Sequence, residues 1–94
     1  MADIILPNNS GAVILNAVAA TGRSLAVRMS DMASIRVTIT GTATVDIEKS
    51  VDGTNRKVMT TLTASADYVT DEPGLWTFNV TAFTSGTITA TVMT

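Results

Sequence analysis

The regular alternation of apolar and polar residues is the feature that most restricts the fold of this chain. The apolar positions that follow residue 34 with the same parity are Ile35, Val37, Ile39, Val45 and Ile47. A period of two residues is the signature of a β-strand with one buried face. Of the 17 threonines, 16 follow residue 37, and Thr favours the extended state because its χ1 angle is restricted. The sequence therefore predicts an all-β domain.

The spacing of turn residues indicates how the strands are organised. A length of 94 residues suits a single domain, 1–94, with a small core. Seven or eight short strands, separated by turn signals at nearly regular spacing, are typical of a sandwich or a small barrel. We expect one antiparallel β-sandwich of immunoglobulin-like or jelly-roll type, with residues 1–11 as an N-terminal docking arm. Residues 16–20 could form a helical turn that Gly22 ends.

The segment EKSVDGTNRKVM predicts a hairpin rather than a ligand loop. If Asp52-Gly53 forms a two-residue type I′ turn, Ile47 pairs with Val58 on one face. The same register places Glu48 opposite Lys57 on the other face, which joins two opposite charges. A calcium loop would need more oxygen ligands at fixed spacing than this segment supplies.

Gly41 interrupts the alternation and leaves two arrangements open. In the first, an odd-length loop returns the chain within one sheet and pairs Ile39 with Val45. In the second, one continuous strand bends at Gly41 and passes from one sheet to the other. The sequence favours neither.

The C-terminal segment predicts a second hairpin. A three-residue loop, Thr84-Ser85-Gly86, places Gly where a bulged hairpin requires left-handed backbone. The expected cross-strand pairs are Phe78–Val92, Val80–Ala90 and Ala82–Ile88. Trp76 shares the face of Phe78, so we expect it to anchor the core, with a sugar-stacking platform as the alternative.

Composition argues against an enzyme. The chain has no Cys and no His, which removes thiol chemistry and the commonest general base and metal ligand. The one carboxylate pair within a strand, Asp46 and Glu48, is explained as part of a solvated charged face, because Lys49, Arg56 and Lys57 are its neighbours. No phosphate-binding motif is present, and we expect no cofactor and no metal.

Charge and hydropathy also limit the partners and the location. A net charge of −2 without a basic run argues against nucleic acid. No segment is long and apolar enough to span a membrane, and the N-terminus does not resemble a signal peptide. We expect a soluble protein made in the cytoplasm.

Residues 73–94 carry no charged side chain, which is unusual for a free surface. A neutral face of this kind suits a surface that another chain covers. The apolar start of the chain suggests an arm that docks on a neighbour in the same way. The candidate interface residues are Ile4, Ile5, Leu6, Thr77, Asn79, Thr81, Thr87, Thr89 and Thr91.

Two segments carry a resemblance to a known class of proteins. GTATVDIEKSVDGTN, residues 41–55, and the later GLWTFNVTAFTSGTITATV resemble the small β-sandwich virion proteins of tailed bacteriophages. The resemblance covers about residues 33–93. The class often has an aromatic residue after the Asp-Gly turn, where this chain has Arg56-Lys57. No functional residue can be transferred from the class by its motif.

The resemblance implies a structural protein of the virion. The expected function is a capsid cement or decoration subunit that binds the major capsid protein, or another virion protein, and stabilises the shell. Such a subunit would be a homo-oligomer, for example a trimer, and would be made in the host cytoplasm. The alternatives are a head or tail fibre module that binds carbohydrate and a structural subunit of the tail or neck.

Overall fold

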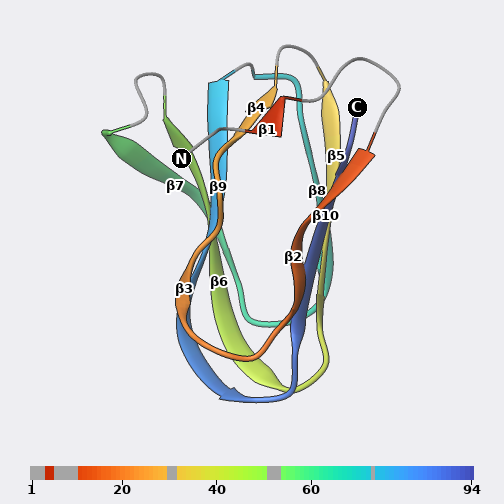
Figure 1. Cartoon of the computed structure of the whole chain (residues 1–94), viewed down its shortest axis with the longest axis vertical. Helices are drawn as coiled ribbons and strands as arrows, with labels where there is room; N and C mark the ends of the chain where they lie inside the picture. Colours follow the sequence, from red (N-terminus) through yellow and green to blue (C-terminus); the bar gives the residue numbers. More distant parts are fainter. Residues whose placement is uncertain (1–3, 6–10, 30–31, 51–53, 73) are drawn as a thin grey trace.

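The structure is a computed structural model that describes residues 4–5, 11–29, 32–50, 54–72 and 74–94. These residues form ten strand segments and no helix, and the segments make two sheets that pack face to face (Figure 1). The predicted all-β sandwich is therefore confirmed. Eight of the ten segments are longer than two residues, as many as the upper predicted number.

The six-stranded sheet runs in the order β1-β4-β9-β6-β7, and β3 also pairs with β9. Its strands are β1 (Ile4–Ile5), β3 (Gly22–Arg23), β4 (Val27–Met29), β6 (Thr42–Ser50), β7 (Arg56–Leu62) and β9 (Gly74–Ser85). The four-stranded sheet runs in the order β2-β10-β5-β8. Its strands are β2 (Gly11–Val18), β5 (Ala33–Ile39), β8 (Ala66–Thr70) and β10 (Ile88–Met93).

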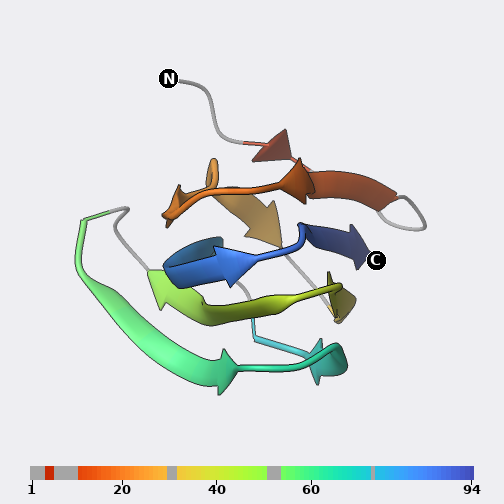
Figure 2. The same cartoon turned by 90° about the horizontal axis from the view of Figure 1, so that it is seen from below.

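The strand pairs are nested, which identifies the topology. β6 pairs with β7, β5 with β8, β3 and β4 with β9, and β2 with β10, all antiparallel. Such nesting results when one long two-stranded ribbon is folded over into two sheets. In both sheets an early strand (orange) is therefore followed by a late one (blue), then by two from the middle of the chain (yellow to green or cyan) (Figure 2). Of the two predicted alternatives, the topology is that of a jelly roll.

Two of the places where the chain crosses between the sheets contact each other. β5 leads into β6 through Gly41, and β9 leads into β10 through Gly86, which has a φ of 85°. A Cβ atom at Gly41 would overlap the backbone carbonyl of Ser85, so only glycine fits. Thr40 N donates to Thr87 O at 3.0 Å, and Thr87 N donates to Thr40 Oγ1 at 2.8 Å. The second of the two Gly41 arrangements is therefore the observed one.

The predicted C-terminal hairpin is wrong, because β9 and β10 lie in different sheets. Phe78, Val80, Ala90 and Val92 are nevertheless all buried, as their parity predicts. The two strands oppose each other across the core instead of lying side by side. Beyond Val80 a bulge in the pairing with β6 changes the parity, so Ala82 is exposed.

The β6–β7 hairpin is present, but its predicted register is wrong. Asp52-Gly53 lies outside the described residues. The observed pairs nearest the turn are Ile47–Thr60, Glu48–Val58, Lys49–Lys57 and Ser50–Arg56. A β-bulge at Met59, which has no partner in β6, shifts the register by one residue. Lys57 is therefore opposite Lys49 instead of Glu48.

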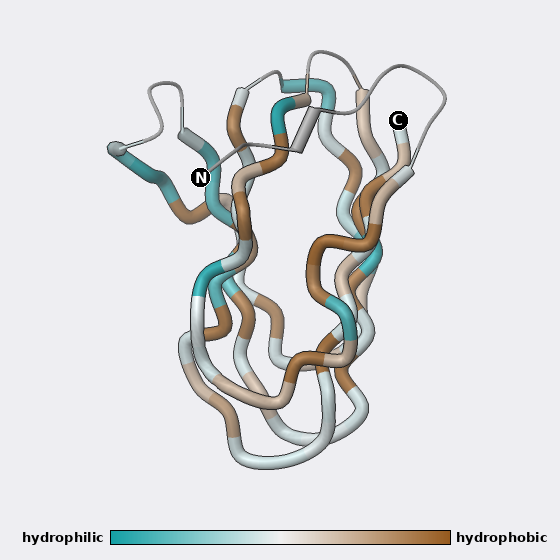
Figure 3. The backbone as a smooth tube through the Cα atoms, viewed as in Figure 1, coloured by the Kyte–Doolittle hydropathy of each residue, from teal (hydrophilic) through white to brown (hydrophobic). Residues whose placement is uncertain are grey.

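The core is built from the inward residues of both sheets. Apolar and polar residues alternate along the strands (Figure 3). Trp76 and Phe78 are fully buried, and the Trp76 ring lies 6.2 Å from the ring of Tyr68, centroid to centroid. The predicted core role of Trp76 is confirmed. The helical turn suggested for residues 16–20 is not formed, because β2 continues to Val18 and pairs with β10.

Candidate interaction surfaces

Within the described residues, charged side chains of opposite sign pair with each other in three places. They contain no group of three or more His, Cys, Asp or Glu side chains that could hold a metal ion. Glu72 accepts from Lys49, and Asp46 accepts from Thr61 at 2.7 Å. No helix in the described part of the chain is long and apolar enough to cross a membrane. The outer faces of the two sheets are the candidates for an interaction surface.

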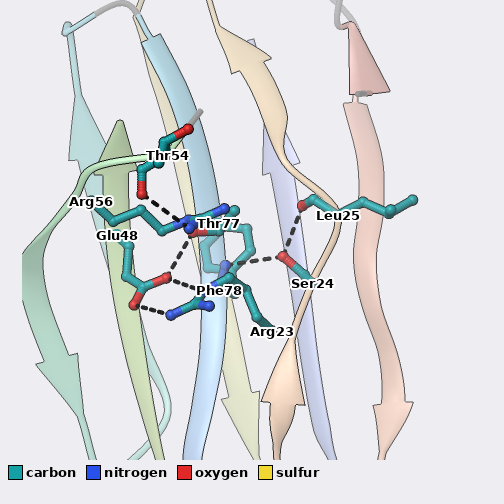
Figure 4. A network of polar contacts seen from close by, with 8 residues as sticks. All are labelled: Arg23, Ser24, Leu25, Glu48, Thr54, Arg56, Thr77 and Phe78. Carbon is teal, nitrogen blue, oxygen red and sulfur yellow. Dashed lines mark hydrogen bonds and ion pairs between the residues drawn. The ribbon is translucent and has the colours of Figure 1, made fainter. Parts of the chain in front are cut away.

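On the outer face of the six-stranded sheet, polar side chains from β3, β6 and β9 form a hydrogen-bonded cluster (Figure 4). Glu48 Oε1 accepts from Arg23 Nε and from Thr77 Oγ1, both at 2.8 Å, and Glu48 Oε2 accepts from Arg23 Nη2 at 3.1 Å. These donors, Arg23 above all, hold the pKa of the Glu48 carboxyl below its ordinary value although burial opposes this. Glu48 is only 5% exposed, so its predicted place on a solvated face is wrong.

The same cluster removes Thr77 from the surface. Thr77 is 3% exposed and its hydroxyl is used by Glu48. Asn79 is half-buried and lies between Arg23 and Asp46 in the register, while Thr81 is exposed. This face thus carries charged groups among its neutral residues, in contrast to the predicted neutral surface.

The predicted threonines of β10 belong to the other sheet, where they are central. Thr91 lies between Val13 of β2 and Arg36 of β5. Thr89 lies beside Thr38, and its Oγ1 accepts from the backbone N–H of residue 17 at 3.2 Å. Thr87 contacts the sheet crossing at residue 40. The candidate residues from Thr77 to Thr91 therefore do not form one surface. The first three are in β9 of one sheet, and Thr89 and Thr91 are in β10 of the other. Thr87 lies at the crossing between the sheets.

Three exposed apolar side chains lie on the same face of the four-stranded sheet as the β10 threonines. Val13, Val69 and Met93 are 54%, 63% and 62% exposed. Met93 and Val69 flank Ser34 in the register, one on each side of β5. A shallow hollow of about 350 Å³ lies over β2 and β10 at this end.

The charges of this face cancel. Arg36 donates to Asp67 at 3.0 and 3.3 Å, and the ion pair crosses from β5 to β8. We call the outward side of this sheet the four-strand face. Its members are Val13, Ser34, Arg36, Thr38, Asp67, Val69, Thr89, Thr91 and Met93.

Sequence reasoning found the β10 threonines but missed their apolar neighbours. Val13 and Val69 lie on strands that the sequence does not show to be joined through β10 and β5. The alternation in β2 and β8 predicts that both side chains point outward, but the strand order is needed to place them on one face.

The N-terminal residues take part in the chain's own fold. Ile4 and Ile5 pair in parallel with Val27 and Arg28 at the edge of the six-stranded sheet. Leu6 lies outside the described residues. The backbone of Ile4–Ile5 thus forms an edge strand, and docking of this segment on a neighbour stays a prediction.

Comparison with known proteins adds no assignment. No family model, no curated protein and no solved structure matches this chain significantly. The candidate surface therefore depends on geometry alone. That surface is the four-strand face, which is open, partly apolar and without net charge.

Proposed function

We propose that the chain is a structural virion protein of a tailed bacteriophage, a capsid cement or decoration subunit that binds and stabilises the shell. Its partner would be the major capsid protein or another virion protein, and it would be made in the host cytoplasm. The resemblance of residues 33–93 to virion sandwiches supports this proposal. The proposal also fits the jelly roll, a fold that occurs in viral capsid domains.

The observation that carries the proposal is the four-strand face. Val13, Val69 and Met93 leave more than half of their surface in water. Complete burial of one such side chain is worth about 1.5–3 kcal/mol, so covering the exposed half of all three would supply roughly 3 kcal/mol. The threonines between them can pair with a partner's polar groups without introducing a charge.

The size of this face indicates how it would be used. Four strands about 4.8 Å apart and about 20 Å long offer roughly 400 Å² in projection. A stable interface buries about 800 Å² per partner. One face alone would therefore bind weakly, and durable attachment would come from several copies acting together. This favours a homo-oligomer, such as a trimer, on a symmetric shell.

The carbohydrate-binding alternative has less support. Trp76 is fully buried and its Nε1 donates to the carbonyl of Glu72 at 3.2 Å, so the ring offers no stacking surface. A tail or neck subunit would use the four-strand face in the same way and differs only in its assembly.

The test is binding to particles assembled from the genome that encodes the chain. We expect Thr89→Lys with Thr91→Lys to abolish co-sedimentation, because two ammonium groups would have to be desolvated beside Arg36. The matched control is Thr63→Lys with Thr84→Lys, which adds the same charge at exposed sites outside this face. If the first pair still binds while both variants remain folded, the surface assignment is wrong.

A further inference from the structure

A second feature lies apart from the four-strand face, beside the edge strand β7. It is a hollow of about 380 Å³, which is within the size range of small-ligand sites. We call it the basic hollow. Its lining residues are Lys49, Asn55, Arg56, Lys57, Met59 and Glu72.

The basic hollow has an excess of positive charge. Lys49 and Lys57 are directly opposite each other in the register, an arrangement that is unfavourable for like charges. Lys49 Nζ donates to Glu72 at 3.1 Å, and its side chain is only 19% exposed. Lys57 forms no ion pair with any residue that the structure describes. Of these two ammonium groups only that of Lys49 is paired with a carboxylate of the described residues, although the net charge of the chain is −2.

The hollow adjoins an open strand edge. β7 is the last strand of its sheet, and within the described residues it pairs only with β6. Its other edge is available to an added strand, which would gain main-chain hydrogen bonds. Strand addition would also place alternate side chains of the added segment on the side where Lys57 lies.

A second copy of this chain is a poor occupant of that edge. Parallel pairing of two β7 strands would bring Arg56 and Lys57 of one copy beside the same cations of the other, and antiparallel pairing would offer them no carboxylate, because β7 contains none. Lysine on an edge strand protects against such self-association. The same cations would attract a segment of opposite charge.

We propose that β7 and the basic hollow bind an extended peptide segment with acidic side chains. The segment adds to the sheet beside β7, and one of its carboxylates enters the hollow and accepts hydrogen bonds from Lys57 and Lys49. Charge-assisted hydrogen bonds of this type are about twice as strong as neutral ones. The carboxylate also relieves the repulsion between the two lysines. This site goes beyond the proposed capsid attachment and does not depend on it.

The probe is an acetylated and amidated octapeptide of alternating Thr and Glu, titrated into the 15N-labelled full chain. We expect the amide signals of residues 56–62 to shift. The matched Thr and Gln peptide should bind at least tenfold more weakly. Acetate and phosphate should shift these signals only at far higher concentrations, because they lack the main-chain contacts.

Two variants with the same loss of charge separate a site from general attraction. Lys57→Gln should weaken binding of the Glu peptide at least fivefold, whereas Arg36→Gln, on the other sheet, should leave it unchanged. The proposal is overturned if the two variants weaken binding equally or Lys57→Gln has no effect. It is also overturned if residues 56–62 do not shift, or if free acetate saturates the same signals at the peptide's concentration.

Discussion

Replacing Glu48 by Gln tests how much the polar cluster on the outer face of the six-stranded sheet stabilises the protein. The substitution keeps the shape of the side chain but removes its charge and turns one acceptor into a donor facing Arg23. Hydrogen bonds to charged groups contribute about 1.5–3 kcal/mol. The Arg23 side chain is 41% exposed and can be rehydrated. We therefore expect a loss of about 1–2 kcal/mol, which for a domain of this size lowers Tm by roughly 5–10 °C.

The matched control is Asp67→Asn, which makes the same chemical change in an exposed ion pair. Arg36 and Asp67 have side chains that are 72% and 55% exposed, so their pair is screened by water. We expect Asp67→Asn to leave Tm almost unchanged. Thermal unfolding followed by the fluorescence of Trp76 measures the Tm of both variants. If the two substitutions destabilise the protein equally, burial of Glu48 is not what gives its ion pair its strength.

The effect of Glu48→Gln should also depend on pH. The pKa of Glu48 is lower in the folded protein than in the unfolded chain. Its contribution is therefore complete above the unfolded pKa of about 4.3 and is lost as pH falls through the folded pKa. The free-energy difference between wild type and Glu48→Gln should be full at neutral pH and shrink in acid. A difference that grows in acid would contradict the assigned hydrogen bonds.

Two further predictions concern the fold and its buried tryptophan. Gly41→Ala should cost about 3 kcal/mol, the upper end of the usual range for overpacking, because the new methyl group meets the backbone of Ser85. Gly11→Ala is its control and should cost much less, since a Cβ atom there would come no closer than 3.2 Å to Met93 Cγ and Val92 O. Similar losses in urea unfolding would contradict the sheet crossing. The fluorescence of Trp76 should have a short emission wavelength and should be quenched neither by iodide nor by added glycans. Quenching by a glycan would favour the carbohydrate-binding alternative.

The inward faces of the strands could be predicted, but the pairing of the strands could not. Phe78, Val80 and Val92 are inward because alternation fixes parity. The same alternation fits a strand that turns back within its sheet and a strand that crosses to the opposite sheet. What decides between them is the contact between Gly41 and the Ser85–Gly86 backbone, which joins segments far apart in the chain.

The candidate surface was only partly predictable for the same reason. Glu48 is buried because Arg23, a residue 25 positions earlier, covers it. No local pattern indicates that contact. The four-strand face likewise depends on β10 lying between β2 and β5, which brings Val13 beside Thr91. The threonines of β10 could be identified as outward and neutral, whereas their apolar neighbours required the strand order.

The central claim is that the four-strand face is covered in the assembled particle. Hydroxyl-radical footprinting of the free and the particle-bound chain tests it directly. Met93 lies on this face and Leu25 lies outside it, and they are 62% and 40% exposed in the free chain. We predict that Met93 is oxidised in the free chain and protected on the particle, while Leu25 reacts equally in both. Equal oxidation of Met93 in the two states, or absence of the chain from purified particles, would contradict the claim.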